Sequence, residues 1–177
     1  AFGDIELDEY AAEAVVVLKS RSGDGWGLGV VVEYEHPAEA GGSKTLNGGP
    51  ILEVADGIWI VSVNPTLTQF FGGGRNAAGA RDEKIDFSYS ARLLYHWSKD
   101  IDLALEAYGT VERIGGRGER SDASQLFGDF DQHRVGPVAY WNFEAANGDA
   151  TLGLGALFGL NSTTTDVALK ASFELTF

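Results

Sequence analysis

The stretch from Ile85 to Ser98, IDFSYSARLLYHWS, decides the fold class of this chain. Its odd-numbered positions are all apolar or aromatic, and its even-numbered positions are polar except for Leu94. Side chains alternate between the two faces of a β-strand, whereas at about 100° per residue the same residues would scatter around a helix. The stretch therefore predicts one long amphipathic strand.

The same period of two recurs along the rest of the 177-residue chain. It predicts further strands over residues 10–21, 26–35, 46–54, 59–71, 101–112, 134–144, 152–161 and 167–177. With the first stretch, this gives about nine strands. No helical period and no linker interrupts the pattern, so residues 1–177 are expected to form one all-β domain.

The predicted connections alternate between short and long. The short ones cover 22–25, 55–57, 98–100 and 146–149 and carry Gly, Asn or Asp, which tolerate the positive φ angles of tight hairpins. The longer ones cover 37–45, 72–84, 115–132 and 162–165. This alternation predicts an antiparallel up-and-down sheet with tight turns at one rim and long loops at the other.

The composition excludes several classes of protein. A net charge of −13 argues against a nucleic-acid-binding protein, which needs a basic face for phosphates. The absence of cysteine excludes disulfide frameworks, thiolate nucleophiles and cysteine-ligated metals. No apolar run approaches the about 20 residues of a transmembrane helix. Because methionine is also absent, the chain is expected to be a mature or trimmed piece without its signal peptide.

Strand length and charge favour a transmembrane barrel over a soluble sandwich. Several predicted strands have about ten or more alternating residues, and about 9–11 residues cross a membrane as a tilted strand, whereas the usual strand has about 5–6. Charges in mid-strand would line the lumen of a barrel whose apolar face contacts lipid. The predicted lumen-lining residues are Glu33, Glu53, Arg92, Glu106, Glu112, Arg134, Glu144, Lys170 and Glu174.

The aromatic residues are sorted toward the strand ends. All tryptophans lie on apolar faces near tight turns, which predicts an interfacial girdle at that rim. They are Trp26, Trp59, Trp97 and Trp141. A second girdle near the long loops is expected from Tyr34, Phe71, Phe87 and Tyr89. The alternative, core aromatics of a sandwich, would not place every tryptophan at one end.

The last predicted strand is the most specific feature of the sequence. It ends in Phe177, with Leu175 and Phe173 at alternating positions before it. In this ending the chain resembles Gram-negative outer-membrane β-barrel proteins, whose C-terminal aromatic signal is recognised by the barrel assembly machinery. The resemblance implies insertion in outer-membrane lipid, with periplasmic tight turns and extracellular loops.

Three segments carry a narrower resemblance: 22–34 (SGDGWGLGVVVEY), 134–137 (RVGP) and the ending LGLGALFGLN…VALKASFELTF. They resemble a family of proteobacterial outer-membrane barrel proteins, which implies architecture but no established substrate. Single-chain bacterial barrels usually have an even number of strands, whereas about nine are predicted here. Either N-terminal strands or another chain must then pair an open edge, or one strand among 10–21 and 46–54 is wrongly assigned.

Two polar motifs invite a chemical interpretation. His96 shares a polar strand face with Asp86, but the two would lie roughly 33 Å apart along one strand, so a serine–histidine–acid site would need partners from other strands. The loop 117–132 holds three aspartates that could bind calcium, but it lacks the ligand spacing of an EF-hand. We therefore expect no catalytic residue, metal site or cofactor.

The function that the sequence favours is a passive, pore-like or structural role of an outer-membrane barrel without enzymatic activity. Acidic residues exceed basic ones on the predicted lumenal faces, and such an excess would favour cations in an open pore. The sequence leaves open whether the lumen conducts or is filled by side chains. The first alternative is a barrel enzyme acting on lipid or peptide, and the second is a soluble calycin-like ligand carrier.

Overall fold

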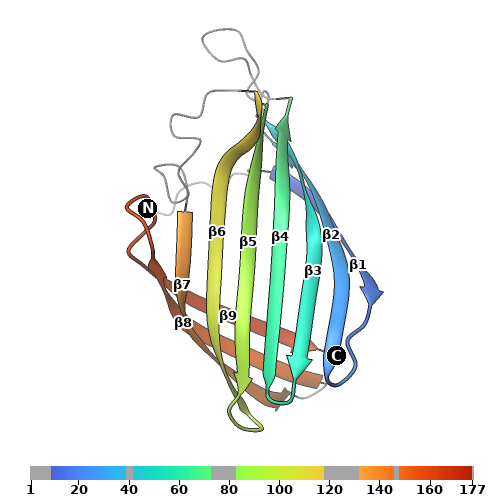
Figure 1. The fold of residues 1–177 in the computed structure, drawn as a ribbon, viewed down its shortest axis with the longest axis vertical. Helices are drawn as coiled ribbons and strands as arrows, with labels where there is room; N and C mark the ends of the chain where they lie inside the picture. Colours follow the sequence, from blue (N-terminus) through green and yellow to red (C-terminus); the bar gives the residue numbers. More distant parts are fainter. Residues whose placement is uncertain (1–8, 39–41, 73–82, 118–131, 146–147, 177) are drawn as a thin grey trace.

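The computed structural model describes residues 9–38, 42–72, 83–117, 132–145 and 148–176, and in these residues all regular structure is β. Figure 1 shows one sheet in which the strands follow one another in chain order, each antiparallel to its neighbours. The strands are β1 (Glu9–Lys19), β2 (Gly25–Pro37), β3 (Lys44–Asp56), β4 (Trp59–Phe71), β5 (Glu83–His96), β6 (Ile101–Arg117), β7 (Gln132–Ala145), β8 (Gly148–Gly159) and β9 (Val167–Thr176).

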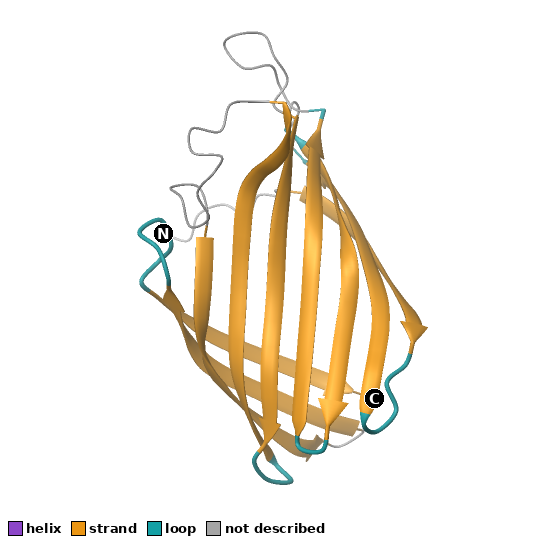
Figure 2. Ribbon diagram, in the orientation of Figure 1, coloured by secondary structure: helices purple, strands orange, loops and turns teal. Residues whose placement is uncertain are grey.

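The predicted strand count and the antiparallel order are confirmed, and among the described residues Figure 2 shows only strands and loops. No helix long and apolar enough to cross a membrane occurs in the described part of the chain. The tight turns have the predicted backbone: Gly23 and Gly57 have φ angles of 59° and 57°, which residues with a Cβ adopt only at a cost. The turn residues therefore fix where β1 ends and β2 begins, and where β3 ends and β4 begins.

The pairing register assigns every strand residue to one of two faces, because directly opposed residues of an antiparallel pair point to the same side. Following the pairs from Glu33 across the sheet places all nine predicted lumen-lining residues on one face. Side chains from β6 and β9, three strands apart, meet on this face. It is therefore the inner side of the curl, which we call the concave face, and the opposite side is the convex face.

The sheet is strongly curled but not closed. In Figure 1, β8 and β9 pass behind the middle strands, yet β1 and β9 are the two ends of the sheet order and do not pair with each other. In an antiparallel sheet of nine strands the first and last run in the same direction, so they cannot form the antiparallel pair that joins all the others. The predicted closed barrel is therefore not confirmed, whereas the nine-stranded antiparallel sheet is.

The concave face carries a small apolar cluster toward the tight-turn end of the strands. Leu94, Ala104, Val138 and Tyr140 form a small buried cluster, against which Ile60 packs. Glycine on β8 makes room for it: a Cβ on Gly153 would lie 2.7 Å from the ring of Tyr140. The glycine therefore lets the tyrosine extend across β8 toward β9.

Candidate functional site

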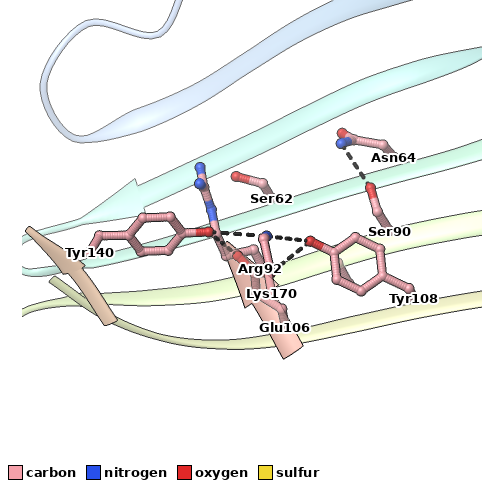
Figure 3. Close-up of a pocket in the computed structure, with 9 residues that line it drawn as sticks. Ser62, Asn64, Ser90, Arg92, Glu106, Tyr108, Tyr140 and Lys170 are labelled. Carbon is pink, nitrogen blue, oxygen red and sulfur yellow. Dashed lines mark hydrogen bonds and ion pairs between the residues drawn. The ribbon is translucent and has the colours of Figure 1, made fainter. Parts of the chain in front are cut away.

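The most highly connected polar group on the concave face consists of Glu106 and Tyr108 on β6, Tyr140 on β7 and Lys170 on β9. We call these residues the central cluster (Figure 3). The Tyr108 hydroxyl donates to Glu106 Oε2 at 2.6 Å, and the Tyr140 hydroxyl donates to Glu106 Oε1. Lys170 Nζ donates to Glu106 Oε2, and to the hydroxyls of Tyr108 at 2.8 Å and Tyr140 at 3.3 Å.

Within the central cluster, the hydrogen-bond donors of Lys170 and the acceptors of Glu106 all find partners. The ammonium group of Lys170 has three hydrogens and three acceptors, and both carboxylate oxygens of Glu106 accept hydrogen bonds. Glu106 is only 2% exposed, so its charge is taken out of water and depends on Lys170 for compensation. The cluster therefore ties β9 to β6 and β7 and helps to fix the curvature of the sheet.

An open hollow of about 210 Å³ lies beside the central cluster, toward β4 and β5. Its wall includes Ser62 and Asn64 from β4, and Ser90 and Arg92 from β5 (Figure 3). Asn64 Nδ2 donates to Ser90 Oγ at 3.1 Å, and Arg92 Cζ lies 5.9 Å from the centroid of the Tyr140 ring. The hollow thus combines hydroxyls, an amide and a guanidinium on one polar surface.

Other predicted lumen-lining residues form ion pairs along the same face. Arg21 Nε lies 2.5 Å from Glu53 Oε1. Lys84 Nζ lies 2.8 Å from Asp86 Oδ2 and 3.3 Å from Glu112 Oε2. Glu53 and Glu112 were predicted to line the lumen, whereas their partners Arg21 and Lys84 were not among the predicted lumen-lining residues.

The remaining predicted lumen-lining acids are less enclosed. Glu33 is half-buried and lies directly opposite Glu13 on β1, a like-charge pair on one face. Glu144 and Glu174 are exposed toward the tight-turn rim. The structure therefore brings Glu106 and Lys170 together and leaves these acids apart from them.

His96 has a cross-strand acid partner that the sequence did not identify. Its Nδ1 lies 2.6 Å from Asp102 Oδ1, and Asn142 donates to the other oxygen of Asp102 at 2.9 Å. Thr151 in turn donates to Asn142 at 2.8 Å. Among the described residues no serine hydroxyl is hydrogen-bonded to His96, so the network is a row of polar residues across four strands rather than a serine–histidine–acid arrangement.

The convex face carries the aromatic residues of both predicted girdles. The tryptophans near the tight turns are between 45% and 65% exposed: Trp26, Trp59, Trp97 and Trp141. Trp59 packs against Tyr95 with a centroid separation of 4.7 Å, and Lys19 Nζ lies 3.3 Å above the ring of Trp26. Toward the long loops, the rings of Tyr34 and Phe71 are 6.3 Å apart. Aromatic rings therefore lie at both ends of the convex face, and those near the tight turns are the more exposed.

Some predictions fall at or beyond the limits of the described residues. Phe173 and Leu175 of the predicted assembly signal are exposed on the convex face of β9, whereas Phe177 lies outside the described residues. Most of the loop 117–132, whose three aspartates could bind calcium, also lies outside them. In the described residues, no group of three or more His, Asp or Glu side chains could hold a metal ion.

The sequence did not identify the central cluster, although it placed all four side chains on polar strand faces. Alternation gives the face of a residue, but the meeting of Glu106 and Lys170 depends on the register of four strands. Tyr108 and Tyr140 were the available signal, because each is an aromatic residue that interrupts an otherwise polar or small face.

Comparison with known proteins gives no relative from which a function could be carried over. No family model, no curated protein and no solved structure matches the chain. The resemblance to outer-membrane barrels stays a prediction, and the function is inferred from the geometry and chemistry of the two sheet faces.

Proposed function

We propose that this protein is an integral outer-membrane β-barrel with a passive, pore-like or structural role and no enzymatic activity. The observation that carries the proposal is the large apolar surface of the convex face. Monomeric soluble proteins rarely expose contiguous apolar patches of more than a few hundred Å². A wall that faces lipid needs such a surface.

The apolar residues on the convex face recur on neighbouring strands, so they form a continuous surface rather than isolated exposures. Leu52 and Val54 on β3 are 41% and 53% exposed, and Leu105 on β6 is 52% exposed. Further exposed residues of this surface are Leu46, Val61, Leu67, Leu93, Leu103, Leu154, Phe158, Leu169 and Phe173. The aromatic rings at both ends of the strands support placement in a bilayer, where Trp and Tyr prefer the interfaces.

The concave face supports a water-filled or water-accessible lumen. Charges lie within its strands and form pairs there, as between Lys170 on β9 and Glu106 on β6. Acids outnumber bases on this face, so an open lumen would favour cations. The exposed apolar surface on the opposite side argues against a soluble ligand carrier, in which the charged face would be the outer one.

A lipid-embedded wall of this kind needs its two edges paired, because unsatisfied backbone groups are costly in hydrocarbon. β1 and β9 run in the same direction, so an odd number of added strands completes an all-antiparallel barrel with an even strand count. We propose that these strands come from a further segment of the same protein or from another chain.

Membrane fractionation tests the proposal. We expect the protein, expressed with a signal peptide in a Gram-negative host, to sediment with the outer membrane and to remain there after washing with sodium carbonate. The physical reason is the apolar convex face, which detergent must cover before the protein leaves the bilayer. Recovery of folded protein in the periplasmic soluble fraction without detergent would contradict the proposal.

A further inference from the structure

We propose that the middle of the concave face binds a small oxyanion, a phosphate or a carboxylate, between Arg92 and Arg134. Both guanidinium groups belong to half-buried side chains on this face, Arg92 on β5 and Arg134 on β7. The site is distinct from the central cluster, whose ammonium group already donates all its hydrogens to Glu106 and the two tyrosines.

Neither arginine has an acid partner in the part of the chain that the structure describes. Among the described residues, Arg92 and Arg134 form no ion pair or hydrogen bond through their side chains, although other bases of the face do. The acid directly opposite Arg92 is Glu106, and its oxygens are taken up by the central cluster. Two guanidinium groups therefore remain available on a face where the bases Arg21, Lys84 and Lys170 are paired with acids.

The register brings the two arginines within reach of one ligand. Ser90, which is two residues from Arg92, pairs with Tyr108, and Tyr108 pairs with Arg134. With strands about 4.8 Å apart and about 3.3 Å per residue, the two arginine Cα atoms lie about 12 Å apart. Both side chains rise from the inside of a curled sheet, from the two strands that flank Tyr108 on β6.

Each arginine lines its own hollow, and the two hollows share one lining residue. The hollow of about 210 Å³ contains Arg92, and a second one of about 250 Å³ contains Arg134. Tyr108 lines both, and hydroxyl groups line each of them: Ser62 and Ser90 in the first, Thr110 in the second. Guanidinium groups with neighbouring hydroxyl donors are the groups that recognise phosphate and carboxylate oxygens.

Unpartnered polar atoms on residues that line the two hollows point to a ligand. Asn64 lines the first hollow and Arg134 lines the second, and each has one buried side-chain atom, Oδ1 and Nε respectively, without a hydrogen-bond partner within the described structure. Buried polar groups in folded proteins nearly always have a partner. If these side chains turn toward the hollows, an oxyanion accepts from the guanidinium of Arg134, and the hydroxyl of a singly protonated phosphate donates to Asn64 Oδ1.

The local charge also favours an anion. The chain as a whole has a net charge of −13, but the groups around the two hollows are Arg92, Arg134 and the neutralised pair of Lys170 and Glu106. These four side chains sum to a charge of two positives. The two hollows therefore form a positive region, which attracts an anion, on a face whose other charges are mainly acidic.

Titration of the purified, detergent-solubilised protein with inorganic phosphate tests the site, with isothermal titration calorimetry as the readout at constant ionic strength in sodium chloride. We expect saturable binding, and we expect Arg92→Gln and Arg134→Gln each to weaken it about tenfold or more, because each removes charge-assisted hydrogen bonds. Arg92→Lys keeps the charge but not the two-pronged geometry, so its affinity should fall between those of the parent and Arg92→Gln. It also serves as the second variant if Arg92→Gln does not fold.

The matched control is Lys19→Gln, which removes one positive charge from the convex face and should leave phosphate binding unchanged. Competition by acetate would assign the site to oxyanions in general, and its absence would assign it to phosphate. No saturable binding by the parent, or an equal loss in Lys19→Gln and Arg92→Gln, would overturn the proposal. Membrane fractionation has a separate readout, so failure of the anion site leaves the proposed location unaffected.

Discussion

Replacing Lys170 by methionine is expected to lower the free energy of unfolding by about 3–5 kcal/mol, the cost of leaving a buried charge without its partner. Glu106 is 2% exposed, and Lys170 supplies the positive charge that compensates it. The change also removes the hydrogen bonds that Lys170 donates to Tyr108 and Tyr140. Denaturant unfolding of the protein in detergent or lipid, followed by tryptophan fluorescence, measures the loss.

Two further variants separate the buried charge from general damage. Adding Glu106→Gln to Lys170→Met removes the uncompensated carboxylate, so the double variant should recover a large part of the loss. Lys19→Met removes a lysine from the convex face, where only a cation–π contact with Trp26 is lost, and should cost about 0.5–1 kcal/mol. If Lys170→Met were no more destabilising than Lys19→Met, the central cluster would not hold β9 to β6.

Replacing Val30 by arginine should destabilise the protein by about 2–4 kcal/mol, the cost of a charge on the lipid-facing side of a barrel near the middle of the bilayer. Val30 lies near the middle of β2 on the convex face, opposite Val16 and Pro50. Unfolding in lipid vesicles measures the effect.

The matched control is the neighbouring residue, Val31. It lies on the concave face opposite Gly49, and two residues from Glu33, which attracts a cation. We therefore expect Val31→Arg to change the free energy of unfolding little. Equal destabilisation by Val30→Arg and Val31→Arg would show that the convex face does not contact lipid.

The strands could be predicted from the sequence because the alternation of apolar and polar residues is long and uninterrupted. The alternation from Ile85 to Trp97 corresponds to β5, although the strand ends at His96. The turns could be predicted because glycine at positions such as Gly57 marks positive φ. The face of each lumen-lining residue followed from the same alternation.

Two features could not be predicted, for different physical reasons: whether the sheet closes into a barrel, and the central cluster. Alternation gives strands and faces but not the relation between the first and last strand, and with nine strands β1 and β9 run in the same direction. The contact between Glu106 and Lys170 depends on the summed register of β6 to β9, because a slip of one residue in any pair would move Lys170 to the other face. His96 and Asp102 were missed likewise, since their pairing depends on the register between β5 and β6.

The central claim is that one face of the sheet contacts lipid and the other contacts water, and a spin-label scan of β2 in lipid vesicles tests it most directly. The chain has no cysteine, so single cysteines can be introduced at Val30, Val31, Val32 and Glu33 without removing others. Power-saturation measurements then compare collisions of each label with oxygen, which concentrates in the bilayer, and with a water-soluble nickel chelate. We predict high oxygen and low nickel accessibility at positions 30 and 32, and the reverse at 31 and 33. Equal nickel accessibility at all four positions, or the opposite alternation, would contradict the account.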